Sequence, residues 1–312
     1  MKAVFLDRGS FPKSINIVYP DCVTHITEFD NTHPNEVIER IEAADFVLTN
    51  KVEVNRAAIE SSSTLKLVQV MATGTNNVDK VACEENHVSV QNVDGYSGIS
   101  VPEHTFSLLL ALRRNLTSYL EDVKKGRWAE AEFFCFLDHP IQDLANTTLA
   151  IMGNGNLGQK VAKIADAFSM KVIFIEHKNA PLVRPGYTDF EQALKIADVV
   201  TLHCPLTDKT KNIISYDEFE IMKSNCVLIN TGRGGLVDEI ALTDALTNKK
   251  IAAAGFDVAT QEPMPIDHPL QKLTKLPNFL LTPHVAWASA EAMQSLVDIG
   301  MAKIKRFSEE TI

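Results

Sequence analysis

The sequence lacks several features that would mark a secreted, membrane-bound or metal-binding protein. Its 312 residues include only five cysteines, an odd number scattered without metal-ligand spacing, which favours a reducing cytoplasm over a disulfide-bonded fold. We expect these cysteines to fill apolar interior rather than to act as nucleophiles. No apolar run approaches the length of a membrane span, and the run in residues 1–7 is too short for a secretory signal. We therefore expect a cytoplasmic protein with no membrane partner and no bound metal.

Positive charge is also in deficit. The chain has 30 lysines and arginines against 40 aspartates and glutamates, which gives a formal net charge of −10. Nucleic-acid binding requires a basic surface, so this balance argues against a nucleic-acid partner. Hydrophobic residues make up 45% of the chain and charged residues 22%, which is typical of a globular protein with a sizeable core. The length predicts about two domains.

The most informative stretch runs from Thr148 to Glu176. A strand-like apolar run leads into a glycine motif with glycines at 153, 155 and 158, and apolar residues at helical spacing follow it. A second apolar run, 171–175, ends at Glu176. A lone glycine motif is often a tight turn without a ligand, but here strand, helix, second strand and terminal acid are all in place. This unit therefore predicts a dinucleotide site.

Each glycine of this motif has a separate expected task. Gly153 allows the tight turn, Gly155 lets the backbone approach the pyrophosphate, and Gly158 lets the helix pack closely on the strand. The helix N-terminus offers free N–H groups to the phosphates. Glu176 would accept hydrogen bonds from the adenine-side ribose, and its charge would repel a 2′-phosphate. We therefore expect NAD(H) as cofactor and disfavour NADP(H).

Strands alternate with helices on both sides of this unit, which predicts an α/β fold with parallel sheets. The stretch 95–100 is flexible in composition and is the best candidate for a domain boundary. We expect strands at 2–7, 46–49, 67–71, 88–92, 149–152, 171–175, 199–203, 226–230, 251–257 and 279–282, and helices at 35–44, 55–61, 81–86, 103–125, 189–196, 217–222, 238–248 and 288–307, besides the helix that follows Gly158.

Residues 127–143 are irregular and rich in aromatic side chains, among them Trp128, Phe133, Phe134 and Phe136. A loop-like apolar stretch of this kind favours contact with another domain or another subunit. Packing within the local core is the alternative.

Three residues with catalytic chemistry follow predicted strands. Arg233 comes after Ile229, Glu262 after the strand that ends at Asp257, and His284 after the last strand, and ligands of open α/β sheets bind at such strand ends. A guanidinium can grip a carboxylate through two parallel hydrogen bonds. An imidazole exchanges protons near neutral pH, and a neighbouring carboxylate favours its charged form. Singly, each residue could be a structural loop residue; together they indicate reduction of a 2-oxo acid.

These motifs resemble a known family, the D-isomer-specific 2-hydroxyacid dehydrogenases. The resemblance covers nearly the whole chain, through GNGNLG (153–158), HCPLT (203–207), INTGRGGLVDE (229–239), the segment 255–263 and TPHVAW (282–287). Within the family the chain is most similar to glycerate dehydrogenases (hydroxypyruvate reductases), through ATGTNNVD (72–79), EHTFSLLLALRRN (103–115) and the segment 128–136.

The resemblance implies a role for each matching position. Arg233 would bind the substrate carboxylate, and His284, supported by Glu262, would be the proton donor. The further implied contacts are backbone N–H groups of Thr73 and Gly74 on the carboxylate, Asn156 and Leu157 on the pyrophosphate, Asp257 on the nicotinamide amide, and Thr207 and Thr231 along the cofactor cleft. Glu176 stands where Asp is commoner in the family, and His177 and Lys178 follow it, so the preference for NAD over NADP is not strict.

The resemblance also implies an architecture. We expect two Rossmann-like, doubly wound parallel-sheet domains, with the nucleotide domain inserted into the substrate domain. Residues 1–100 plus 283–312 would form the substrate domain and 101–282 the NAD-binding domain. Family members are usually homodimers, with the helix after Pro102 and the segment beyond it in the interface.

The expected activity is NADH-dependent interconversion of hydroxypyruvate and D-glycerate. The alternatives are another 2-oxo acid (glyoxylate, pyruvate or 3-phosphohydroxypyruvate) or an NAD(H)-sensing interaction protein like the family's corepressors. A formate-dehydrogenase relative is disfavoured because Gln would be expected at position 262. Trp287 and Met71 either shape the substrate pocket or only fill space.

Overall fold

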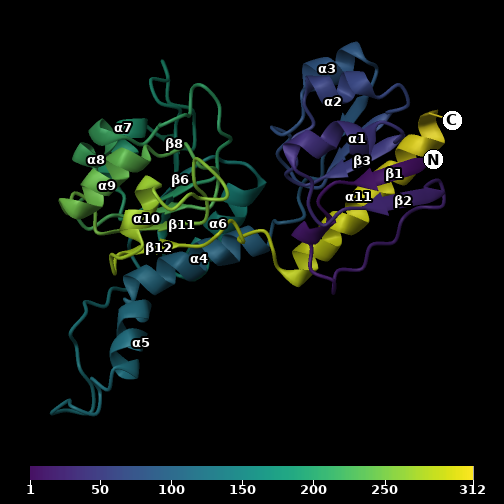
Figure 1. The fold of residues 1–312 in the computed structure, drawn as a ribbon. Helices are drawn as coiled ribbons and strands as arrows, with labels where there is room; N and C mark the ends of the chain where they lie inside the picture. Colours follow the sequence, from purple (N-terminus) through teal and green to yellow (C-terminus); the bar gives the residue numbers. More distant parts are fainter. Residues whose placement is uncertain (312) are drawn as a thin grey trace. The chain divides into compact units, whose positions relative to one another are not determined.

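The computed structural model describes residues 1–311 and divides into two compact units, Met1–Ser97 together with the segment from Ala288, and Gly98–Trp287. We call them the terminal unit and the central unit (Figure 1). The expected return to the first domain at residue 283 comes too early. The segment 283–287 stays with the central unit because its backbone is hydrogen-bonded to Asp257, through His284 N to the carbonyl and Val285 N to the carboxylate.

The terminal unit contains a five-stranded sheet in the order β2-β1-β3-β4-β5, whose strands pair in parallel. Valines and alanines of α1, α2 and α3 pack on one face of the sheet. On the other face lies α11, where Phe307 meets Phe46 of β3 edge-on at 6.0 Å between ring centroids. The elements are β1 (Lys2–Phe5), β2 (His25–Glu28), β3 (Phe46–Thr49), β4 (Leu67–Val70), β5 (Ser89–Gln91), α1 (Val37–Ile41), α2 (Arg56–Ser61), α3 (Lys80–Glu85) and α11 (Ala290–Thr311).

The central unit is a seven-stranded parallel sheet in the order β12-β11-β10-β9-β6-β7-β8. The chain enters at β6, builds outward to β8, then crosses back and builds outward the other way from β9, so the strand order reverses between β6 and β9. The strands are β6 (Thr148–Met152), β7 (Lys171–Ile175), β8 (Tyr187–Thr188), β9 (Val199–Leu202), β10 (Val227–Asn230), β11 (Ala253–Phe256) and β12 (Phe279–Leu281), and the helices are α4 (Ser100–Arg113), α5 (Leu116–Lys124), α6 (Asn156–Ala167), α7 (Phe190–Ile196), α8 (Tyr216–Ile221), α9 (Glu239–Thr247) and α10 (Pro269–Leu273).

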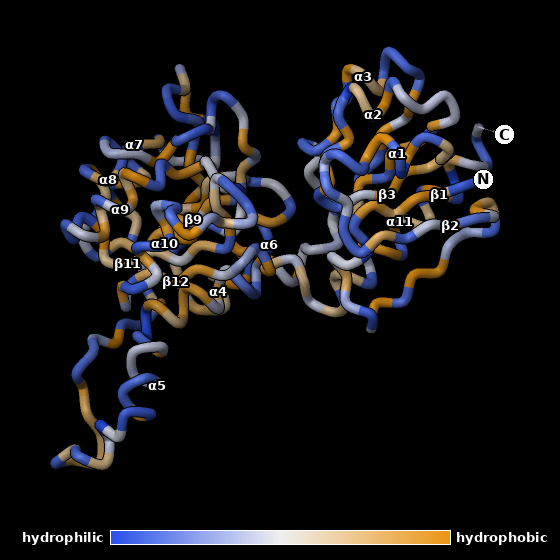
Figure 2. The backbone as a smooth tube through the Cα atoms, in the orientation of Figure 1, coloured by the Kyte–Doolittle hydropathy of each residue, from blue (hydrophilic) through white to orange (hydrophobic). Residues whose placement is uncertain are grey.

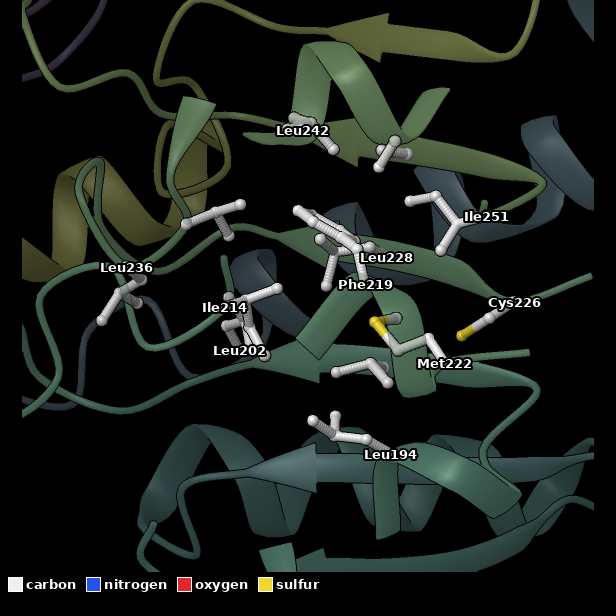
Figure 3. Packing of buried hydrophobic residues seen from close by; sticks show 14 of the residues in the cluster. Leu194, Leu202, Ile214, Phe219, Met222, Cys226, Leu228, Leu236, Leu242 and Ile251 are labelled. Atoms are coloured by element: carbon white, nitrogen blue, oxygen red, sulfur yellow. The ribbon is translucent and has the colours of Figure 1, made fainter. Parts of the chain in front are cut away.

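Both faces of this sheet are covered, which explains why every residue of β9 and β10 is buried. Figure 3 shows one face, where Phe219 of α8 and Leu242 of α9 pack against Leu228 of the sheet. On the other face, side chains of α4 and α6 such as Leu109 and Val161 form a second apolar cluster. Phe219 is 1% exposed, so its replacement by alanine would cost about 3–5 kcal/mol of stability. The expected α/β class with two parallel sheets is confirmed.

Side-chain caps begin several helices where the sequence predicts their starts. The Asn55 side chain accepts a hydrogen bond from Ala58 N at 3.0 Å, and that of Asp189 accepts one from Gln192 N at 3.1 Å. Asp238 accepts from two backbone N–H groups of α9. Such caps satisfy N–H groups that have no partner within the helix.

The predicted helix 103–125 is wrong as a single element. Asn115 adopts a left-handed conformation with φ of 45° and separates α4 from α5, and its side chain donates to the carbonyl of Pro140. Asn tolerates this backbone region better than most residues. Three short elements, β2, β8 and α10, were not expected, because runs of two to five residues give too little periodicity to read.

Helix α5 and the loop to residue 143 extend away from the rest of the central unit (Figure 1), and apolar and polar residues alternate along them (Figure 2). We call α5 and residues 126–143 the arm. No residue of α5 is buried. Phe133 and Phe134 are 76% and 89% exposed, so these side chains do not pack into a core of this chain.

Residues 1–311 lack two further features. No helix there is long and apolar enough to span a membrane. No group of three or more His, Cys, Asp or Glu side chains there is placed to hold a metal ion.

Candidate active site

The carboxyl ends of the parallel strands of the central unit meet at one edge of its sheet. Because these strands pair in parallel, the residues that follow them share this edge. The predicted site residues at this edge are Gly153, Gly155, Asn156, Leu157 and Gly158 after β6, Glu176 after β7, Thr207 in the loop after β9, Thr231 and Arg233 after β10, Asp257 and Glu262 after β11, and His284 after β12.

The glycine loop after β6 has the shape that a pyrophosphate requires. Gly153 has φ of +106°, and a Cβ there would lie 2.5 Å from the His203 carbonyl oxygen. A Cβ on Gly158 would lie 2.0 Å from the Gly153 oxygen, so helix and strand pack too closely for any side chain. In contrast, the Cβ position of Gly155 has no atom within 4 Å, which leaves the approach from solvent open.

Helix α6 begins at this open position. Gly155 is its N-cap, no side chain caps it, and its first turn carries no acidic residue. The N–H groups at the start of a helix have no partner within it and favour an anion. Asn156 and Leu157 are the first two residues of α6, so their N–H groups belong to this set. The loop therefore fits a dinucleotide pyrophosphate.

Glu176 directly follows β7 in a buried position, with a side chain that is 2% exposed. Its carboxylate accepts hydrogen bonds from the backbone N–H groups of His177 and Arg184, and from Nε and Nη2 of the Arg184 side chain. The pKa of Glu176 is lowered to about 2, mainly by the hydrogen bonds from the Arg184 guanidinium. The sequence did not predict this ion pair.

His284 and Glu262 lie in direct contact. His284 Nδ1 is 2.6 Å from Glu262 Oε2, and both side chains remain partly exposed, at 23% and 35%. The other carboxylate oxygen, Oε1, accepts a hydrogen bond from Ala259 N. Glu262 thus holds Nδ1 of the imidazole and directs Nε2 away from itself, as an orienting carboxylate does beside a proton-transferring histidine.

Asp257 holds the turn that carries His284. Its carboxylate is 1% exposed and accepts hydrogen bonds from the Thr282 hydroxyl at 2.5 Å, from Val285 N at 2.9 Å and from Ala286 N at 2.9 Å. His284 itself has φ of 55°, a conformation that costs about 1–3 kcal/mol and persists only where the surroundings impose it. Asp257 therefore positions His284.

Two more groups support this turn. His104 Nε2 of α4 lies 2.9 Å from the Thr282 hydroxyl, and the indole N–H of Trp287 donates to the His284 carbonyl at 3.0 Å. Trp287 was expected either to shape the pocket or to fill space, and its hydrogen bond gives it a third task at the turn.

The loop that carries Glu262 is anchored by a second, buried pair. His268 Nε2 is 3.1 Å from Glu239 Oε2, and the two side chains are 6% and 7% exposed. The Glu239 carboxylate also accepts hydrogen bonds from the N–H and hydroxyl of Thr260. His268 Nδ1 accepts a hydrogen bond from Leu270 N, and its Nε2 lies 3.0 Å from the Thr260 hydroxyl, which itself donates to Glu239. We call Glu239, Thr260 and His268 the loop anchor.

Arg233 lies on the neighbouring loop, after β10. Its Nη1 donates to the Gly232 carbonyl at 2.7 Å, and its own carbonyl accepts from the Asn230 side chain at 3.0 Å. A Cβ on Gly234 would be 1.9 Å from the Ala259 oxygen, so the Arg233 loop and the Glu262 loop touch through their backbones. This contact brings the two loops to the same part of the edge.

The remaining predicted residues lie in varied settings. The Thr231 hydroxyl is buried against that of Thr105 at 2.8 Å, whereas Thr207 is exposed and its hydroxyl lies 3.1 Å from that of Thr210. Thr73 and Gly74 follow β4 of the terminal unit, where the Thr73 hydroxyl donates to the Val93 carbonyl. Their assigned contacts with cofactor and substrate stay predictions.

Comparison with known proteins decides the family. Residues 106–286 match the model described as D-isomer specific 2-hydroxyacid dehydrogenase, NAD binding domain. The chain belongs to this family. It is therefore an oxidoreductase of the 2-hydroxyacid dehydrogenase type, and its central unit is an NAD(H)-binding domain.

The family is supported by similarity over whole chains. A Haemophilus influenzae protein named as a 2-hydroxyacid dehydrogenase is 45% identical over 99% of both chains. A glycerate dehydrogenase of Methylorubrum extorquens is 42% identical over 98% of this chain and 96% of its own. The structure of an acyclic imino acid reductase in complex with NADPH and D-Arg superposes with a TM-score of 0.83 at 28% identity, over 99% of this chain and 98% of that one. Within the family this member is glycerate dehydrogenase-like.

The sequence did not predict the residues that hydrogen-bond or pair with Glu176 and with Glu239. Arg184 lies eight positions after Glu176 with no motif to link them. The carboxylate of Glu239 belongs to a quoted motif, yet its partners Thr260 and His268 lie more than twenty residues away. No signal in the local sequence pattern marks Glu239 as buried beside these partners.

Proposed function

We propose that this enzyme reduces hydroxypyruvate, with NADH, to D-glycerate and also turns over related small 2-oxo acids. The observation that carries the proposal is the 2.6 Å contact between His284 Nδ1 and Glu262 Oε2 at the strand edge that also bears Arg233 and the glycine loop. The similarity to a glycerate dehydrogenase over the whole chain supports the choice of substrate.

Each residue of the candidate site has a defined task in this reaction. NADH, when held by the glycine loop, would provide the hydride for the 2-oxo carbon. Arg233 grips the substrate carboxylate with its guanidinium, whose planar fork matches two oxygens. The new alkoxide requires a proton, which His284 gives from Nε2 while Glu262 holds Nδ1. Asp257 and Trp287 keep the backbone of His284 in the conformation that aims the imidazole.

The test is a steady-state assay with NADH and four acids: hydroxypyruvate, glyoxylate, pyruvate and 3-phosphohydroxypyruvate. We expect the highest kcat/KM for hydroxypyruvate and D-glycerate as the product, identified by chiral chromatography. If one of the other three acids has a higher kcat/KM, that acid is the preferred substrate, and the proposed reaction, reduction of a 2-oxo acid, is unchanged. Absence of turnover with all four acids, by folded protein that binds NADH, would contradict the proposal.

We further propose that the arm joins two copies of this chain in a homodimer. Leu116, Leu120 and Val123 of α5 are 45–51% exposed, and the exposed phenylalanines lie on the loop that follows. An apolar surface of this kind favours a partner surface that excludes water. The indole N–H of Trp128 donates to the Phe134 carbonyl at 2.9 Å. The loop that carries Phe133 and Phe134 therefore has a defined conformation.

Light scattering after size-exclusion chromatography tests the dimer. We expect the mass of two chains for the wild type and of one chain for the double variant F133S/F134S. The control is L182S, which alters an apolar side chain that is 77% exposed outside the arm. A monomeric wild type would contradict the proposal.

A further inference from the structure

The negative charge of Glu176, from which the sequence predicts NAD over NADP, is paired with Arg184 in the structure. The Glu176 carboxylate accepts five hydrogen bonds, from the N–H groups of His177 and Arg184 and from the Arg184 guanidinium, at 2.6–3.0 Å. A carboxylate has about four lone-pair positions. These contacts therefore occupy the acceptor sites that ribose hydroxyls would use.

The cation of this pair is the group that faces solvent. The Arg184 side chain is 48% exposed, whereas that of Glu176 is 2% exposed. Nε and Nη2 of Arg184 are bound to Glu176, and Nη1 donates to no acceptor among residues 1–311. An incoming anion at the end of β7 therefore meets a guanidinium with free N–H groups, and the carboxylate behind it is already neutralised.

The Arg184 guanidinium is held in place on an aromatic ring. Its central carbon lies 4.0 Å from the ring centroid of Tyr187 in β8, a cation–π contact that fixes the plane of the guanidinium. The Tyr187 hydroxyl accepts a hydrogen bond from the Asn154 side chain at 3.1 Å. Because Asn154 lies within the glycine loop, Arg184 is connected to the loop that fits the pyrophosphate.

A second cation that follows β7, Lys178, is already bound elsewhere. Lys178 Nζ is 2.6 Å from Glu218 Oε1 and lies over the Phe190 ring. Glu218 is buried and also caps α8, so release of Lys178 would leave a buried carboxylate with one partner fewer. Arg184 is thus the cation at this strand end that has donors to spare.

We propose that Arg184 receives the 2′-phosphate of NADPH, so that this enzyme binds NADPH as well as NADH. A guanidinium that presents several N–H groups in one plane matches phosphate oxygens. Glu176 acts here as the residue that positions Arg184, and its charge no longer repels the phosphate. The inference rests on the dinucleotide site and not on the identity of the 2-oxo acid.

The test is the Kd of NADH and of NADPH, measured by isothermal titration calorimetry without any 2-oxo acid. For the wild type we expect two Kd values within about tenfold of each other. R184Q should weaken NADPH binding roughly ten- to hundredfold, as the loss of a charge-assisted hydrogen bond predicts, and change the Kd of NADH less than about threefold. R184K, which keeps the charge but loses the fork, should fall between them.

The matched control is K178Q, which removes a neighbouring cation and should leave the NADPH-to-NADH ratio unchanged. The retained NADH affinity of R184Q shows that this variant is folded. Equal weakening of both dinucleotides in R184Q, or a wild type that binds NADH alone, would overturn the inference. If the NADPH affinity follows Arg184 while no 2-oxo acid is reduced, the proposed substrate fails and this inference stands.

Discussion

Two of the imidazole–carboxylate pairs in the central unit, His284–Glu262 and His268–Glu239, differ mainly in their exposure to solvent. His284 and Glu262 are partly exposed, with 2.6 Å between Nδ1 and Oε2, whereas His268 and Glu239 are nearly buried, with 3.1 Å between Nε2 and Oε2. An exposed imidazole can exchange a proton with a ligand. A buried one, with both ring nitrogens bound to protein groups, can only hold structure in place. Identical side-chain types thus serve chemistry in one place and architecture in the other.

The two pairs are physically connected. Thr260 binds Glu239 of the buried pair, and two residues later Glu262 begins the exposed pair. The buried pair therefore sets the position of the loop from which the exposed carboxylate reaches His284. Substitutions in either pair, or at a third imidazole, test this difference.

The largest effect should come from the exposed histidine. We expect H284Q to lower kcat for hydroxypyruvate roughly 10²- to 10⁴-fold, because the alkoxide loses its proton donor. Steady-state kinetics at saturating NADH measures this loss, and an unchanged Kd for NADH serves as control. A kcat within tenfold of the wild type would remove His284 from the reaction.

Replacement of its carboxylate partner should have a smaller effect. In E262Q the amide can still contact Nδ1 but cannot hold the charged imidazole, so we expect kcat to fall about a hundredfold, at the lower end of what proton transfer contributes. The measurement is kcat across pH 5–9. If E262Q kept the full kcat and the same pH profile, Glu262 would have no part in proton transfer.

The buried pair should affect stability more than chemistry. H268Q removes one partner of the Glu239 carboxylate, and we expect the free energy of unfolding to fall by about 1–3 kcal/mol. The displaced loop should lower kcat less than tenfold. Urea unfolding measures the free energy of unfolding, and steady-state kinetics of the same preparation measures kcat. The control is H25Q, which replaces an exposed histidine. A loss of kcat as large as that of H284Q would mean that the buried pair takes part in the chemistry.

A third imidazole has no carboxylate partner, and its expected effect is the smallest. Burial lowers the pKa of His203 to about 4, and its Nδ1 is shielded from solvent without a hydrogen-bond partner among residues 1–311. The unfolded chain, with a pKa near 6.5, then binds more protons than the folded one as pH falls from 6.5 to 4, so folding weakens over that window. H203Q should reduce the stability difference between pH 7.5 and pH 5 by about 2 kcal/mol.

Urea unfolding of wild type and H203Q at both pH values measures this difference. Comparison of the two proteins cancels the contributions of other titrating groups. Equal pH dependence in both would mean that His203 is protonated in the folded chain.

Local patterns in the sequence were sufficient for the parts of this protein that depend on near neighbours. The apolar runs of β6 and β7, the glycines between them and the caps at Asp189 and Asp238 all lie within a few residues of what they control. Arg233, Glu262 and His284 were found because each follows a recognisable strand. Parallel pairing then brings strand ends together without further information.

Tertiary structure alone decided which charged groups are neutralised and which apolar faces remain open. Arg184 reaches Glu176 because the chain turns back between β7 and β8, and His268 reaches Glu239 from a separate helix. The apolar face of α5 reads in sequence like that of α4, yet it is exposed because Asn115 ends α4 first. Charge pairing and burial depend on neighbours distant in sequence, and periodicity carries no information about them.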